Sequence, residues 1–218
     1  MIREFAFSYS DRHHFFDSSK KTSFENTPKD TFISLYGYDN YVIKFFEGTK
    51  SLSGFDGSIY MPKEFLLDVD GGTVENAKAK TIELLKLLKS LEVPYNIYFS
   101  GRGFHVGIPD TAFQWEPCQN LHLKVKDELT KKGIYNYADS SVTDKTRIIR
   151  LNNTLNTKSR LWKIYMDENE LNNLSGIEIQ SLATSIVFPS TSSKNSLGIY
   201  TLPSNPDKDL VPSKNFIT

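Results

Sequence analysis

The chain has 218 residues, and its 39% hydrophobic and 13% aromatic content is typical of a globular protein, which excludes a wholly disordered one. Basic and acidic residues both number 26, so the net charge is zero and gives no indication of a nucleic-acid partner. The single cysteine, Cys118, excludes an internal disulfide framework and a cysteine-rich zinc site.

No apolar run approaches the roughly 18 residues of a membrane span, and charged residues stand where a signal peptide would be apolar. We therefore expect a protein of the reducing cytoplasm that has no membrane partner.

The first 60 residues are irregular and rich in aromatic side chains. Two runs in this region, 31–38 and 41–46, have the composition of short strands. The run 64–70 (EFLLDVD) is apolar and of strand length, and two glycines follow it. Thr73 then has the type and position of a residue that caps a helix, and the apolar spacing predicts that this helix ends at about Leu91.

The rest of the chain continues this alternation of strands and helices. Apolar residues recur every three or four positions from Cys118 to Gly133 and predict a second helix. Further strands are predicted at 95–99, 104–108, 134–138, 147–151 and 161–166. From residue 64 the order is strand, helix, strand, strand, helix, strand, which is the split βαβ order of ferredoxin-like and RNA-recognition-motif-like folds. From Ser181 onward, serine, proline and asparagine predominate, so we expect an irregular tail.

Asp68 and Asp70 lie two positions apart at the end of a predicted strand, so their side chains should share one face. Two adjacent carboxylates repel each other unless a cation lies between them, which makes the pair a candidate Mg²⁺ or Mn²⁺ site. The alternative is a pair of acids that only caps a turn.

The predicted hairpin around SGRGFH contains a second candidate group. Glycines in its turn can expose backbone N–H groups to phosphate oxygens, and Arg102 and His105 add basic side chains. The alternative is a surface hairpin in which His105 contacts a neighbouring side chain.

A third acid, Asp139, ends a predicted strand and could complete a two-metal site, with Asp144 as the competing candidate. Between Lys145 and Lys163 the chain has six basic residues and no acid. Such a stripe can bind polyphosphate or a nucleic-acid backbone, or it can be a solvated surface.

These motifs occur in the order found in the archaeo-eukaryotic primase superfamily, which includes small primase subunits and plasmid, viral and CRISPR-associated primase-polymerases. FLLDVD resembles the first motif of that family, SGRGFH the second, and DSSV followed by RIIRLNNTLNTKS the third. The resemblance covers roughly residues 3–165.

The resemblance implies an α/β fold in which an N-terminal α/β module (1–62) packs on an RNA-recognition-motif-like module (63–166), with the active site in the cleft between them. Residues 167–218 complete this single catalytic domain without an assigned role. The implied metal ligands are Asp68, Asp70 and Asp139, holding two Mg²⁺ or Mn²⁺ ions. The implied nucleotide-binding residues are Ser100, Arg102, Gly103, His105, Arg150, Asn156 and Lys158.

The implied activity is that of a DNA primase-polymerase, which transfers nucleotides from NTPs or dNTPs to a primer on a single-stranded DNA template. Candidate protein partners are a helicase, an accessory primase domain and CRISPR-associated proteins. Two rival interpretations stay open. LLDVDGGT also resembles the first motif of haloacid-dehalogenase-like phosphohydrolases, in which Asp68 would be a nucleophile. The other is a nucleic-acid-binding module without catalytic activity.

Overall fold

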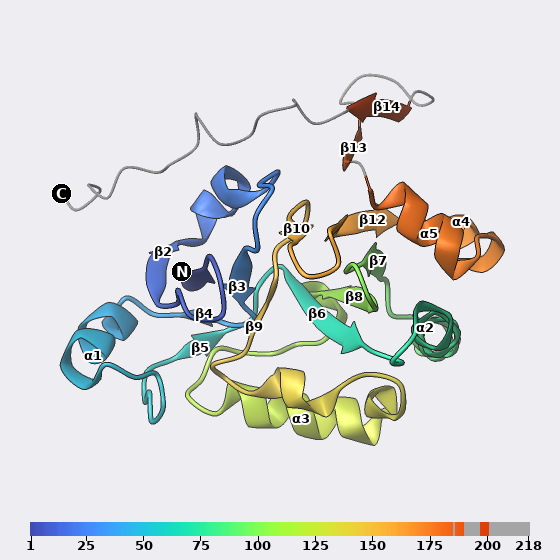
Figure 1. Cartoon of the computed structure of the whole chain (residues 1–218). Helices are drawn as coiled ribbons and strands as arrows, with labels where there is room; N and C mark the ends of the chain where they lie inside the picture. The colour runs from blue at the N-terminus through green and yellow to red at the C-terminus, as the bar shows by residue number, and fades with distance from the viewer. Residues whose placement is uncertain (185, 190–196, 201–218) are drawn as a thin grey trace.

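The computed structural model describes residues 1–184, 186–189 and 197–200, and it has a mixed α/β fold built around two antiparallel sheets (Figure 1). The first sheet has the order β5-β4-β1-β3-β9, and β2 pairs with the free edge of β1. Its strands are β1 (Ile2–Ala6), β2 (His14–Asp17), β3 (Phe32–Ser34), β4 (Gly37–Tyr38), β5 (Ile59–Tyr60) and β9 (Ile148–Arg150). None of the helices in these described residues is long and apolar enough to cross a membrane.

The second sheet has the order β12-β7-β8-β6. Its strands are β6 (Glu64–Val69), β7 (Asn96–Phe99), β8 (Phe104–Pro109) and β12 (Ile164–Met166). Helices α2 (Val74–Ser90) and α3 (Leu121–Lys131) follow β6 and β8 in the chain. The predictions of β6, β7, β8 and α2 are confirmed, and the Thr73 side chain accepts from the Asn76 N–H as the predicted cap.

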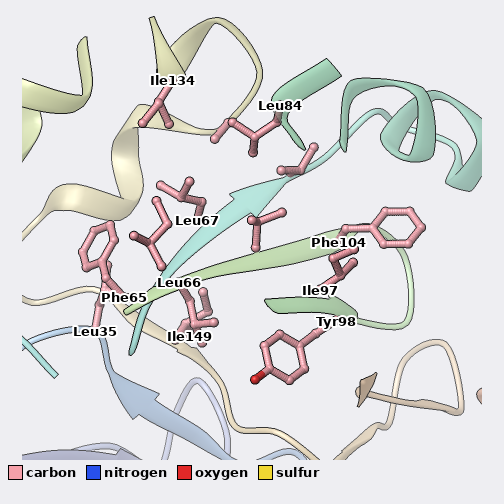
Figure 2. Packing of buried hydrophobic residues seen from close by; sticks show 14 of the residues in the cluster. Leu35, Phe65, Leu66, Leu67, Leu84, Ile97, Tyr98, Phe104, Ile134 and Ile149 are labelled. Atoms are coloured by element: carbon pink, nitrogen blue, oxygen red, sulfur yellow. The ribbon is translucent and has the colours of Figure 1, made fainter. Parts of the chain in front are cut away.

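The main core packs on both faces of the second sheet, and the site lies on the face that meets the first sheet. Figure 2 shows Leu67 of β6 beside Leu84 of α2 on one side of the strand, and Leu66 beside Ile149 of β9 on the other. Because successive side chains of a strand point to opposite faces, Asp68 shares the face of Leu66. That face meets the first sheet at Leu66 and carries the acid two residues further on.

Two predicted strands are wrong. Residues 41–46 lie in helix α1 (Tyr41–Thr49), because Val42, Phe45 and Phe46 have helical spacing and pack together on the core around Tyr38. Residues 134–138 form the 3-10 helix η3 (Ile134–Asn136) and the turn after it, following Gly133 in a left-handed conformation (φ 74°). The strand predicted as the last element of the split βαβ order is therefore not formed by residues 134–138. Just after them, the Asp139 N–H donates to the Asp68 carbonyl of β6 at 2.8 Å.

Two further boundaries differ from the sequence predictions, and one confirmed strand belongs to the first sheet. Cys118 precedes α3 and forms an isolated bridge with Ile59. The predicted strand 161–166 is divided into β11 (Leu161–Trp162), which pairs with β10 (Leu155–Asn156), and β12. The predicted strand 147–151 is confirmed as β9, but it pairs with β3 of the first sheet.

The C-terminal segment contains two short helices, α4 (Glu168–Asn173) and α5 (Gly176–Leu182). Each begins with a capping box, in which Asp167 pairs with Glu170 and Ser175 with Glu178. The irregular tail expected from Ser181 is wrong for the hairpin of β13 (Ile186–Pro189) and β14 (Leu197–Tyr200). Residues 185, 190–196 and 201–218 of that predicted tail lie outside the described part of the chain. The remaining 3-10 helices are η1 (Ser18–Phe24), η2 (Asp110–Ala112) and η4 (Ser140–Thr143).

Replacing Leu88 by alanine is expected to lower the free energy of unfolding by about 2–5 kcal/mol, because the side chain is fully buried and leaves a cavity. Lys86→Ala, two residues away on the exposed side of α2, should change it by less than about 0.5 kcal/mol. Urea unfolding of both variants checks this. Equal effects would contradict the packing of α2 described here.

Candidate active site

The pairing of β6 with β8 places Asp68 directly opposite His105, and the next strand, β7, adds Tyr98 to the same row. The His105 Nε2 lies 3.7 Å from the Asp68 Oδ1, which is longer than a normal hydrogen bond. Burial, and after it the charge of Lys163, lowers the pKa of His105 well below its ordinary value. The imidazole is therefore neutral at neutral pH, and its Nδ1 is buried without a hydrogen-bond partner.

Asp68 is the one of the three predicted metal ligands whose pKa is raised. Burial raises its pKa; Arg147 opposes this shift, and the charges of Asp139 and Asp70 add to it. The Arg147 guanidinium lies 3.9 Å from an oxygen of Asp68 and 3.7 Å from an oxygen of Asp139. One arginine therefore supplies positive charge between two carboxylates that are 71 positions apart in the sequence (139 − 68 = 71).

Asp70 follows β6 and is held in its turn by two contacts. Its carboxylate accepts from the Gly72 N–H at 2.9 Å and from the exposed Arg102 at 2.6 Å. The Gly72 amide and then Arg102 outweigh burial and keep the pKa of Asp70 below its usual value. The hairpin thus places the positive charge of Arg102 next to the carboxylate of Asp70, and this attraction favours the ionised form of the acid.

The two glycines of the hairpin turn are buried, although Gly103 lines the cavity described below, and phosphate binding by their N–H groups stays a prediction. Gly101 has a φ of +97°, a conformation that favours glycine, and a Cβ there would lie 2.9 Å from the Ser159 hydroxyl. At Gly103 a Cβ would lie 2.5 Å from the Val69 carbonyl oxygen. Their role is to let the turn approach β6 and the 156–159 turn, and the Ser100 hydroxyl closes the turn by donating to the Gly103 carbonyl.

The structure separates the two candidates for the third acid. The Asp139 side chain accepts from the N–H and hydroxyl of Ser141 and faces Arg147. Burial alone would raise its pKa, but the Ser141 bonds and Arg147 outweigh burial and lower it. Asp144 instead accepts from the N–H and hydroxyl of Thr146 at 2.7 and 2.8 Å.

A cavity of about 980 Å³ joins the three groups, within the 300–1,000 Å³ typical of ligand sites. Asp139 is not among the residues that line this cavity and adjoins it only through Arg147, whereas Asp144 lines it. The other nine predicted site residues line it: Asp68, Asp70, Ser100, Arg102, Gly103, His105, Arg150, Asn156 and Lys158.

The basic run from Lys145 to Lys163 is not one solvated stripe. The Lys163 side chain is fully buried and donates to the Arg150 carbonyl at 2.9 Å. Arg150 is itself mostly buried, and its guanidinium donates to Asp30 and to the Leu155 carbonyl. Arg147 and Lys158 line the cavity, and Arg147 lies there between Asp68 and Asp139.

Sequence reasoning missed four residues of the opposite wall, which are Tyr9, Arg12, Asp30 and Phe32. The buried Glu4 carboxylate of β1 holds the Arg12 guanidinium by two hydrogen bonds of 2.9 and 3.0 Å. No local motif could have indicated these residues, because pairing of β3 with β9 brings their part of the chain to the site.

The donor chemistry of the three acids suits a divalent cation, since carboxylate oxygens are the ligands that Mg²⁺ prefers. The three ion pairs described above, two from Arg147 and one from Arg102, show that positive charge is favoured between these acids. Across the described part of the chain, however, no three His, Cys, Asp or Glu side chains are grouped closely enough to hold a metal ion. The two arginines would have to leave the carboxylates for a cation to bind them.

No protein-family model matches the chain, and no curated protein does either. Among solved structures, the polymerase domain of Mycobacterium tuberculosis ligase D in complex with DNA is similar, with a TM-score of 0.38 and 12% sequence identity. The match covers 70% of this chain and 58% of that one, so this chain spans less than two thirds of its length. A likeness of this size carries no functional argument, and the function has to be argued from the site.

Proposed function

We propose that this chain is a nucleotidyltransferase of the primase-polymerase type, with the archaeo-eukaryotic primase fold that its motifs resemble. Its substrates would be NTPs or dNTPs, a single-stranded DNA template and a primer. The observation that carries the proposal is the convergence of Asp68, Asp70 and a set of basic side chains from three separate motifs on one cavity, with Asp139 joined to Asp68 through Arg147. A helicase, an accessory primase domain or CRISPR-associated proteins would be its protein partners.

The charge distribution of the cavity suits a triphosphate. The acids Asp68, Asp70 and Asp139 are compensated by Arg102 and Arg147, which are both partly exposed and can turn toward phosphate oxygens. Lys158 adds an exposed cation on the 156–159 turn. If Arg102 and Arg147 moved from the carboxylates to the phosphates, the carboxylates would be released and the phosphate charge would be neutralised in one step.

In the proposed reaction the primer 3′-hydroxyl attacks the α-phosphorus of the nucleotide, a new P–O bond forms, and the bond to the leaving pyrophosphate breaks. Two Mg²⁺ or Mn²⁺ ions held by the three acids would supply activation of the hydroxyl and charge compensation. The protein's own groups orient the triphosphate: Arg102, Arg147 and Lys158 by charge, and His105 by a hydrogen bond from a neutral imidazole.

The test is incorporation of labelled nucleotides by the purified protein with single-stranded template and Mn²⁺ or Mg²⁺, with and without primer. We expect pyrophosphate release that depends on template and divalent metal. Tight nucleotide binding without incorporation would favour the rival non-catalytic module, for which the present pairing of the acids with arginines is the supporting observation. Hydrolysis of a simple phosphate ester with a covalent adduct on Asp68 would favour the phosphohydrolase instead.

Replacing His105 by glutamine is expected to weaken nucleotide binding about tenfold and template binding by less than twofold, because its side chain lines the cavity beside the acids and one hydrogen bond is lost. His122→Gln, which changes a histidine outside the cavity, is the matched control. Titrations with a labelled nucleotide and a labelled single strand measure both affinities. An equal loss of both would mean that His105 acts only through the fold.

A further inference from the structure

Tyr9 leaves 77% of its side chain exposed, although it lines the cavity. It lies in the loop between β1 and β2, where the Phe7 N–H donates to the Asp11 carbonyl and the Asp11 N–H to the Ser8 carbonyl. These bonds close the loop around it. Of the eight large hydrophobic side chains exposed in the described part of the chain, Tyr9 is the one that lines the cavity.

One side of the Tyr9 ring packs against the buried Phe32 ring, which in turn contacts Arg150. Its centroid lies 4.7 Å from that of Phe32, which is only 3% exposed. Phe32 pairs in register with Arg150, whose guanidinium carbon lies 4.8 Å from the Phe32 ring centre and is held by Asp30. An aromatic ring that is fixed on one side and exposed on the other is suited to stack on a planar ligand.

The ring lies in the same cavity as the acids but at another end of it. Residues 147–150 line the cavity, with Arg147 at Asp68 and Asp139 and Arg150 at Phe32. Their strand, β9, lies beside β3 (Figure 1). Three residues of extended chain cover about 10 Å. One ligand could therefore place charged groups at the acidic end and a flat group at the aromatic end.

We propose that Tyr9, supported by Phe32, is the base-stacking subsite for the nucleotide whose phosphates lie near Arg102 and Arg147. This inference rests on the proposed function and names how the base is held. Stacking uses the flat face that all bases share, so Tyr9 contributes affinity with little preference among the four bases.

The experiment compares binding of inorganic tripolyphosphate with binding of the four common nucleoside triphosphates, by calorimetry in the presence of Mn²⁺. The protein should bind each nucleotide about tenfold more tightly than tripolyphosphate, which lacks a base. Tyr9→Ala should remove this difference and leave the tripolyphosphate affinity unchanged, whereas Tyr9→Trp should keep it. Tyr165→Ala is the matched control, since Tyr165 is 60% exposed, packs on the Tyr98 ring and lies outside the cavity.

Three results would overturn the proposal. Tyr9→Ala could weaken tripolyphosphate and nucleotides equally, or leave both unchanged. It could also weaken binding of a single-stranded oligonucleotide alone, in which case the ring stacks on template bases. If the unmodified protein bound neither tripolyphosphate nor nucleotide, the proposed function would fail along with the subsite, whereas intact tripolyphosphate binding with no Tyr9 effect would refute the subsite only.

Discussion

Asp68→Asn is expected to reduce template-directed incorporation by about a thousandfold or more while the protein stays folded. Asp68 lies 3.7 Å from His105 and 3.9 Å from Arg147, and in the proposed reaction its negative charge is needed for the cations. Asparagine keeps the size of the side chain and removes the charge. Primer extension under single-turnover conditions measures the effect.

The direction of the Asp68 pKa shift also predicts how Asp68→Asn changes the stability of the fold. Burial raises the pKa of Asp68, so the folded protein binds the proton of this carboxyl more tightly than the unfolded chain does. At neutral pH the ionised carboxylate therefore lowers the free energy of unfolding. Without divalent metal, Asp68→Asn should therefore leave the melting temperature unchanged or raise it slightly. Asp127→Asn, a surface acid paired with Lys131, controls for general effects. A folded Asp68→Asn protein with substantial activity would refute the assignment.

Asp139→Asn is also expected to abolish incorporation, whereas Asp144→Asn should retain it within about tenfold. Both acids follow α3 in the chain, 8 and 13 residues after Lys131, but only Asp139 shares Arg147 with Asp68. Asp144 uses its carboxylate to close a local turn on Thr146, so its loss should affect stability more than catalysis. Incorporation assays and thermal melts of both variants separate the two roles.

This pair also separates the polymerase from the phosphohydrolase. A phosphohydrolase with Asp68 as nucleophile would form an aspartyl phosphate and would not need Asp139. Phosphate-ester turnover that survives Asp139→Asn, together with binding of BeF₃⁻ at Asp68, would contradict the proposal. We expect no such turnover in any variant.

The sequence predicted the elements of the second sheet more accurately than those of the first. β6, β8 and α2 have six or more residues each and clear apolar patterns, and glycines or a capping threonine bound them, so local signals decide them. The predictions of strands at 41–46 and 134–138 are wrong. In short segments rich in aromatic and branched residues, packing on a distant core outweighs the local preference.

The shared face of Asp68 and Asp70 and the hairpin at residues 96–109 follow from local spacing and turn residues in the sequence. Tertiary contacts were needed to place Arg102 on Asp70, to separate Asp139 from Asp144, to bury Lys163, and to bring Tyr9 and Arg12 to the far wall. These contacts depend on β9 pairing with β3, more than 110 positions apart in the sequence. No local pattern encodes such a pairing, because its free energy comes from burying two sheets against each other and not from either segment alone.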